Sequence, residues 1–153
     1  LTRFQNYCDK RDIKPCVRLN GTSDIRWETI LIDGQSIFDH FPAIQFYDYT
    51  KIANRKVDHI SNYDLTFSYS EANPAYAKQV NIALERGLNI AVVFRKKESI
   101  PKTFLNLPTI DGDKNDMRFL DPKQTVVALY AKGKARKDKS GFVIDTQALE
   151  AAA

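Results

Sequence analysis

A capped amphipathic helix that leads directly into an uninterrupted apolar segment is the feature that most constrains the fold of this chain. Asn73 is a typical capping residue at the start of a helix, and Gly87 suits the position just past its end. Between them, apolar side chains recur at helical spacing on one face, at Tyr76, Val80, Ala83 and Leu84. The following segment, 90–94, has no polar residue, as expected of a parallel strand that is covered on both faces. A helix over 74–86 packed against a buried strand predicts an α/β fold.

Four other apolar runs alternate with turn-rich or helical connections and are also predicted to be strands. They lie at 15–19, 44–49, 65–69 and 125–131. Strands separated by such connections are expected to be parallel and joined by crossovers. The prediction is a mostly parallel sheet of about five strands with flanking helices, either an open doubly wound sheet or a partial (β/α) barrel. The segment 107–122 is predicted to be a loop.

The chain of 153 residues has the usual size of one compact domain, and no repeat or low-complexity linker divides it. We expect a single domain over 1–147, with 148–153 (ALEAAA) as a tail or cloning scar. Leu1 already falls in helical spacing with Phe4, which suggests a truncated N-terminus. No apolar run reaches the roughly 20 residues of a membrane helix, and no signal-peptide pattern opens the chain. A cytoplasmic location is expected.

Polar residues follow each predicted strand. In both architectures ligands bind at the carboxyl ends of the parallel strands, so these residues mark the predicted site. The candidate ligand-binding residues are Asn20, Thr22, Thr50, Lys51, Ser70, Arg95, Lys132, Lys134 and Arg136. Asp24 and Glu71 are the candidates for acid–base catalysis, together with a lysine of depressed pKa. One pocket is expected to unite Asn20, Asp24, Thr50, Ser70, Glu71 and Arg95. The alternative is that these residues are separate loop and capping groups.

The cations among the candidates favour an anionic ligand, because lysine and arginine form charge-assisted hydrogen bonds with phosphate. The stretch 132–139 holds five cations in eight residues. It is either a contact for phosphate or nucleic acid or a solvated, mobile hairpin. The net charge of +4 is too small to suggest nucleic-acid binding along a whole face, so the distribution of charge matters more than its total.

Metal and cofactor motifs are weak in this sequence. Cys8 and Cys16 match no metal or cluster spacing, and a structural role is expected for them. Asp111, Asp113 and Asp116 lack the later ligands of a calcium loop, so they predict a turn with solvated carboxylates. No metal site is predicted. No phosphate-binding loop, dinucleotide fingerprint or nucleophile elbow is present, and the sequence does not identify a cofactor.

Four parts of the chain carry a family resemblance. They are Val17-Arg18-Leu19-Asn20-Gly21-Thr22-Ser23-Asp24, Phe46-Tyr47-Asp48-Tyr49-Thr50-Lys51, Asp111-Gly112-Asp113 with Arg118-Phe119-Leu120-Asp121-Pro122, and Lys132-Gly133-Lys134-Ala135-Arg136-Lys137-Asp138 with Ser140-Gly141-Phe142-Val143. Together they resemble uncharacterised bacteriophage and plasmid proteins of the gene-product-88 type, over most of residues 13–145. Such proteins look distantly similar to radical-SAM barrels, which implies a partial (β/α) barrel with a site at its C-terminal rim. The chain lacks the three closely spaced cysteines of the iron–sulfur cluster, so cluster and SAM binding are not expected.

Two functional hypotheses follow. The first is a phage-type protein of the host cytoplasm that binds a phosphate-bearing ligand, a nucleotide or nucleic acid, at the carboxyl rim of the sheet, with catalysis left open. The second is a non-catalytic accessory or inhibitory protein that engages a host protein through the basic stretch 132–139. No membrane partner is expected.

Overall fold

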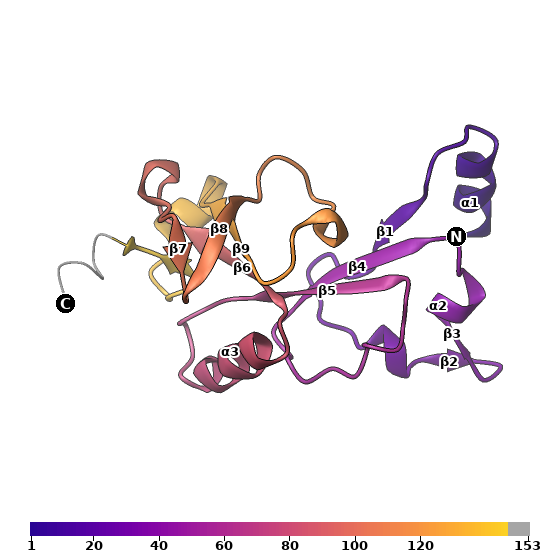
Figure 1. Ribbon diagram of the computed structural model, residues 1–153, viewed down its shortest axis with the longest axis horizontal. Helices are drawn as coiled ribbons and strands as arrows, with labels where there is room; N and C mark the ends of the chain where they lie inside the picture. The colour runs from indigo at the N-terminus through magenta and orange to yellow at the C-terminus, as the bar shows by residue number, and fades with distance from the viewer. Residues whose placement is uncertain (147–153) are drawn as a thin grey trace.

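The computed structural model describes residues 1–146 and has a mostly parallel, open sheet at its centre (Figure 1). Five parallel strands follow one another across it, β1 (Cys16–Arg18), β4 (Gln45–Thr50), β5 (Tyr63–Ser68), β6 (Asn89–Phe94) and β9 (Val126–Tyr130). All five predicted strands and their parallel pairing are therefore confirmed. The sheet does not close, since β1 forms one edge and a short hairpin beyond β9 forms the other.

That hairpin corrects the prediction of a loop over 107–122. Strand β8 (Leu107–Asp111) pairs in parallel with β9, and β7 (Thr103–Phe104) pairs antiparallel with β8. Strand β8 contains Pro108, and its side chains are half-exposed or exposed, so its sequence has no continuous apolar run that would predict a strand. A strand of this kind forms because β9 offers it a free edge, which its own sequence does not reveal.

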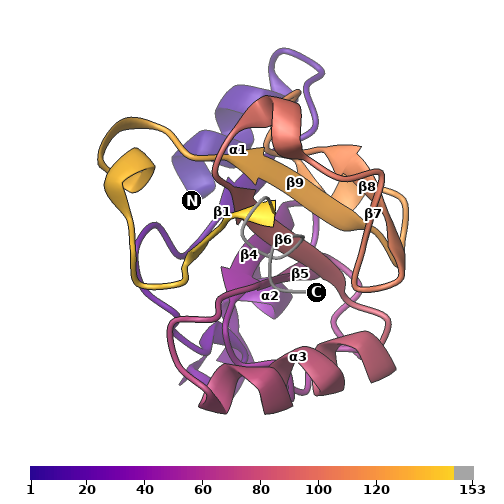
Figure 2. The same ribbon diagram turned by 90° about the vertical axis from the view of Figure 1, so that its left-hand side faces the viewer.

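The last strand, β10 (Val143–Ile144), shares one side of β6 with β5. The register places β5 beside Asn89–Ala91 and β10 beside Val93–Phe94, while β9 occupies the other side of β6. The carboxyl end of β5 therefore leaves the sheet halfway along β6, and the C-terminal segment takes its place. Figure 2 shows β10 lying in front of β6 at this position.

Helix α3 (Ala75–Glu85) lies against one face of the sheet, below β5 and β6 in Figures 1 and 2. Pro74 is the residue at its N-terminal boundary, and the preceding Asn73 accepts a hydrogen bond at Oδ1 from the Ala75 N–H at 2.9 Å. It ends at Glu85, and Gly87 just beyond has a φ of +67°, in the left-handed region that glycine tolerates. The predicted apolar stripe is confirmed, since Val80 is buried in the core that includes Phe67, Ile90 and Val92.

A second core cluster lies on the same side of the sheet, under β4 and β5. Helix α2 (Ile37–His40) begins with a capping box, in which Ser36 and Asp39 each bind the other's backbone N–H. This fixes Phe38, whose ring stacks on Tyr63 with centroids 4.3 Å apart. The remaining helix is α1 (Thr2–Asp9), and β2 (Leu31–Ile32) and β3 (Gln35–Ser36) form a separate hairpin. Single 3-10 turns lie at Trp27–Thr29, Lys97–Ser99, Arg118–Leu120 and Gly133–Lys137. None of the helices in residues 1–146 is long and apolar enough to cross a membrane.

The segment 148–153, expected to be a tail, lies outside the described residues.

Truncation of Val80 tests the packing of α3. The variant Val80→Ala is expected to lower the free energy of unfolding by about 2 kcal/mol, because it leaves a cavity between the helix and β6. Denaturant midpoints measure the change. The matched control is Lys78→Ala on the exposed face, for which a change within about 0.5 kcal/mol is expected. Equal effects of the two substitutions would contradict the packing described here.

Candidate ligand-binding rim of the sheet

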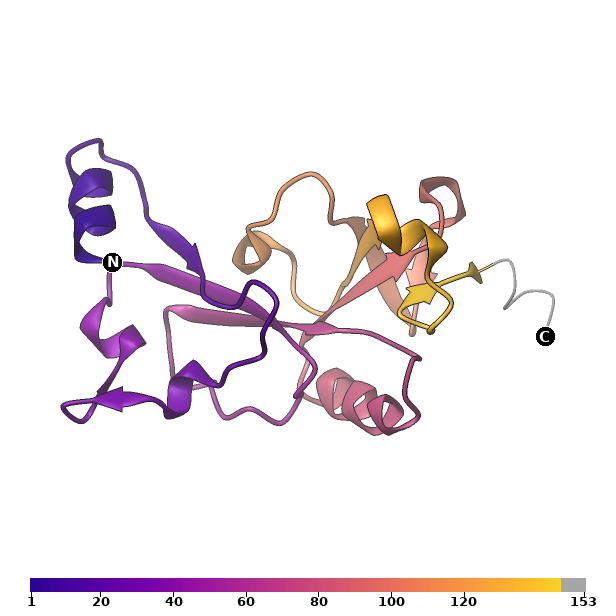
Figure 3. The ribbon, with the colours of Figure 1, turned by 180° about the vertical axis from the view of Figure 1, so that it is seen from behind.

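The carboxyl ends of β1, β4 and β5 border a cavity of about 480 Å³, here called the Lys51 cavity. Figure 3 shows the connection after β1 folding over this end of β4. The lining residues come from three strands, that connection and the C-terminal segment: Arg18, Asn20, Gly21, Thr22, Ser23, Asp24, Tyr49, Thr50, Lys51, Ser68 and Phe142. Five predicted site residues are thus brought together.

The carboxyl ends of β6 and β9 border a second cavity of about 470 Å³, here called the Arg136 cavity. Its lining is mostly cationic: Arg95, Lys96, Lys97, Glu98, Tyr130, Ala131 and Arg136. Two predicted residues, Arg95 and Arg136, belong to it. Lys132 lies nearby with its Nζ 2.5 Å from Asp113 Oδ1, and Lys134 is exposed on the neighbouring 3-10 turn Gly133–Lys137.

Ser70 and Glu71 line neither cavity. The Ser70 hydroxyl accepts a hydrogen bond from the Ala72 N–H at 3.2 Å, and the Glu71 carboxylate accepts one from the Tyr69 hydroxyl at 2.8 Å. The prediction that six rim residues share one pocket is therefore wrong. Because β5 leaves the sheet halfway along β6, its end no longer joins the two halves of the rim.

A buried polar network supports the Lys51 cavity from below. At its centre Arg55, with a fully buried side chain, donates to both carboxylate oxygens of Glu28 at 2.9 and 2.5 Å and to the Tyr63 hydroxyl at 2.9 Å. Tyr63 in turn donates to Asp48 Oδ2 at 2.9 Å. Asp48 also accepts from the backbone N–H and the side-chain amide of Asn20, at 2.6 and 3.1 Å. Burial raises the pKa of the Asp48 carboxyl, opposed by these hydrogen bonds.

Asp24 anchors the connection after β1 to the end of β4. Its carboxylate accepts from the Thr50 hydroxyl at 2.8 Å and from the Lys51 backbone N–H at 2.7 Å, and it lies 3.3 Å from Arg55 Nη1. Asn20 stabilises the same connection, since its Oδ1 accepts hydrogen bonds from the Ile25 backbone N–H and from the Trp27 indole N–H. The contacts made by Asp24 support the loop, a role that differs from the catalytic one proposed from sequence.

Lys51 is a half-buried amine on the wall of its cavity. Its Nζ donates to the backbone oxygen of Ser68 at 2.9 Å and lies 5.2 and 5.3 Å from the ring centres of Tyr76 and Phe142. Within residues 1–146 no carboxylate forms an ion pair with it. Burial lowers the pKa of this amine, and the charge of Asp24 opposes that effect.

Arg95 holds the basic stretch in place. Its guanidinium donates to the backbone oxygens of Arg136 and Asp138, at 3.0 and 2.7 Å, and its Nε lies 3.7 Å from Asp145. The stretch 132–139 is therefore an anchored 3-10 turn and not a free hairpin. Arg95 orders this segment, whereas Lys96, Lys97 and Arg136 line the cavity with exposed side chains.

The connection 112–122 covers the face of β4 opposite α2 and α3. Asp116 accepts hydrogen bonds from the hydroxyls of Tyr47 and Tyr49, at 3.1 and 3.0 Å, and lies 3.7 Å from Arg18 Nη1. Burial and the nearby Asp116 raise the pKa of Tyr47 to about 12. Gly112 lets the connection approach β9, because a Cβ there would lie 2.5 Å from Val127 Cγ1.

A third cavity of about 270 Å³ lies between this connection and the sheet, here called the apolar cavity. It is lined by Arg18, Tyr49, Ser68, Ala91, Val93, Asp116, Leu129 and Phe142, four of which also line the Lys51 cavity. The carboxylates of the predicted Asp111–Asp116 turn are dispersed among protein contacts. Within residues 1–146 no three His, Cys, Asp or Glu side chains lie close enough to hold a metal ion.

Several residues of the site escaped the sequence analysis. Arg55, Glu28 and Tyr63 lie in segments that look like polar connections or strand starts, and the sequence around Asp116 predicts a solvated turn. The sequence signal for this network is Asp48, a carboxylate in a strand rich in aromatic residues, because a buried charge requires partners.

Removal of the central cation tests the buried network. Arg55→Met keeps much of the side-chain volume but leaves Glu28 without its buried partner, so a loss of about 3–5 kcal/mol in the free energy of unfolding is expected. The double variant with Glu28→Gln should recover part of it, since the buried side chain at position 28 is then neutral and no longer needs a cation. Arg26→Met, an exposed arginine, is the control. Full additivity in the double variant would contradict the coupling.

The comparisons with known proteins place the chain in one family. The family model described as Gene product 88 matches residues 1–146. No curated protein and no solved structure matches the chain, and the distant similarity to radical-SAM barrels receives no support. A model that spans nearly the whole chain is sufficient to assign membership, and this protein of phage type therefore belongs to the Gene product 88 family.

Proposed function

We propose that the protein binds a phosphate-bearing ligand, a nucleotide or nucleic acid, at the carboxyl rim of its sheet. The observation that carries this proposal is the concentration of positive charge at one end of that rim. Segments 95–98 and 132–139 together hold eight lysines and arginines and two acidic residues, a net charge of +6, whereas the whole chain carries +4. The remainder of the protein is slightly acidic, so a polyanion is drawn to this end.

The Arg136 cavity combines this charge with an aromatic surface. Tyr130 is half-buried at the end of β9, with the ammonium groups of Lys132 and Lys97 at 4.7 and 5.9 Å from its ring centre. Cations along a groove that contains an aromatic ring suit a single-stranded nucleic acid, whose phosphates contact the cations while a base stacks on the ring. We therefore take a nucleic-acid strand as the ligand of this end of the rim.

The alternative, an accessory or inhibitory protein that engages an acidic surface of a host protein, uses the same cations. It differs in its need for the aromatic ring, because a charged protein surface does not stack on Tyr130. Two experiments distinguish nucleic-acid binding from binding to an acidic protein surface.

The first experiment measures the salt dependence of binding to a fluorescent single-stranded oligothymidylate. For the triple variant Lys96→Gln, Lys97→Gln, Arg136→Gln we expect weaker binding and a slope of log affinity against log salt that is smaller by about 2, since each lost phosphate contact removes about 0.7. The control is Lys10→Gln, Lys14→Gln, Lys78→Gln, which removes the same charge from exposed positions elsewhere. Equal losses in both variants would show that only net charge matters and would refute the site.

The second experiment removes the ring and keeps the charge. Tyr130→Leu is expected to weaken oligonucleotide binding by about 1–3 kcal/mol with the salt slope unchanged, because stacking is lost and no phosphate contact is. Fluorescence anisotropy at several salt concentrations measures both quantities. Unchanged affinity would exclude stacking and favour the protein-binding alternative.

A further inference from the structure

We infer that the Lys51 cavity and the apolar cavity form one binding site for a single nucleoside monophosphate. The phosphate lies against Lys51 and the connection Gly21–Ser23, and the base lies on the apolar floor. This inference rests on the proposed function and deepens it, because it assigns a separate ligand class to the half of the rim that the basic stretch does not reach.

The phosphate position follows from unused donors. Lys51 is a half-buried cation whose hydrogen-bond acceptors are the neutral oxygens of Ser68, at 2.9 and 3.3 Å. Across the described chain, no acceptor receives the backbone N–H groups of Gly21, Thr22 or Ser23. A Cβ placed at Gly21 would meet nothing within 4 Å, so this backbone borders open space. A cation and successive free N–H groups around one cavity are the donors that a phosphate uses.

The connection is held in this shape before any ligand arrives. Arg18 Nε donates to Asn20 O at 2.9 Å and its Nη2 to Gly21 O at 3.2 Å, while Asp24 is tied to Thr50 and Lys51. These contacts occupy the carbonyl oxygens and carboxylate of the segment and leave its N–H groups free. The binding surface is therefore preorganised, which lowers the entropic cost of capturing a ligand.

The base position follows from the apolar floor. Tyr49 and Phe142 line both cavities, and Ala91, Val93 and Leu129 extend the apolar cavity away from Lys51. Pockets that are mainly apolar and carry a few polar groups at one end suit ligands with an aromatic body and a charged head. Arg18, whose guanidinium lies 4.7 Å from the Tyr49 ring centre, marks the junction between the two parts.

Phe142 is positioned by a close backbone contact. Gly141 has a φ of +92°, and its carbonyl oxygen accepts a hydrogen bond from the Glu71 N–H at 2.8 Å. A Cβ at Gly141 would lie 2.9 Å from the Glu71 backbone, so only glycine permits this approach. The segment after β5 thereby aims the Phe142 ring into the site.

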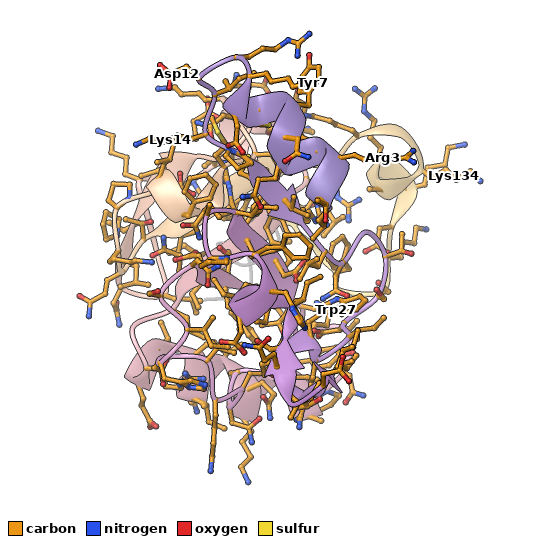
Figure 4. All side chains as sticks on the ribbon, turned by 90° about the vertical axis from the view of Figure 1, so that its right-hand side faces the viewer. Arg3, Tyr7, Asp12, Lys14, Trp27 and Lys134 are labelled. Carbon is orange, nitrogen blue, oxygen red and sulfur yellow. The ribbon has the colours of Figure 1, made fainter. Side chains whose placement is uncertain are left out.

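The test uses the fluorescence of Trp27, the single tryptophan of the chain, whose indole N–H donates to Asn20 at 3.1 Å. Figure 4 shows Trp27 near the middle of the view and Lys134 at the outer edge of the molecule. The probes are adenosine 5′-monophosphate, adenosine and inorganic phosphate. We expect the monophosphate to change the emission and to bind at least about tenfold more tightly than either fragment, since both parts of the site contribute.

Variants then locate the binding. Lys51→Met is expected to weaken monophosphate binding about tenfold, whereas the matched control Lys134→Met changes it by less than about twofold. Phe142→Leu is expected to weaken monophosphate binding and leave inorganic phosphate binding unchanged. It keeps the test valid even if Lys51→Met does not fold.

Equal losses in Lys51→Met and Lys134→Met would place the nucleotide at the basic end and overturn the inference. Equal affinity for the monophosphate and inorganic phosphate would overturn the base position. If the oligonucleotide binds and the monophosphate does not, the inference fails while the proposed function stands, and if neither binds, both fail.

Discussion

The interaction on which the rest of the rim depends is the ion pair between Arg55 and Glu28, with Tyr63 as their shared neighbour. Its members come from three segments that are distant in sequence, and the Arg55 side chain is fully removed from water. A buried charge without its partners costs several kcal/mol, so the three segments are stable only when they are assembled together. The network also reaches Asp48 and Asn20, and through them it fixes the connection that forms one wall of the Lys51 cavity.

The topology of the sheet explains why the rim has two centres. Parallel strands deliver their connections to one edge, and that rule holds on both sides of β6. The edge is divided because β5 pairs only with the first half of β6 and β10 pairs with the second half. Hydroxyl and amide groups with cations and a carboxylate among them gather on the β1–β4 side, and a lining that is mostly cationic lies on the β6–β9 side. The connections that follow the parallel strands therefore form two chemically different surfaces at the same edge of the sheet.

Much of the fold could be predicted from sequence, because the five main strands and helix α3 carry continuous or periodic apolar patterns. Strand β8 could not, since it is defined by the free edge of β9 more than by its own residues. The polar residues predicted at the strand ends do lie there, but their buried partners were not predicted. Arg55 lies in a charged stretch that reads as a solvated connection, and only the convergence of Glu28 and Tyr63 makes its burial favourable. Arg95 lines the Arg136 cavity and also binds backbone oxygens of the basic stretch, and sequence spacing does not show the second role.

The position of β10 beside β6 has a consequence for the order of events during synthesis. About fifty residues separate Val93 from Val143, and the chain between them includes β8 and β9. A ribosome releases the N-terminal half first, so β1, β4 and β5 can pair while the C-terminal segment is still unmade. Phe142 reaches its place only with the docking of β10. A nascent chain can therefore form the β1–β4–β5 part of its sheet before Phe142 is in place.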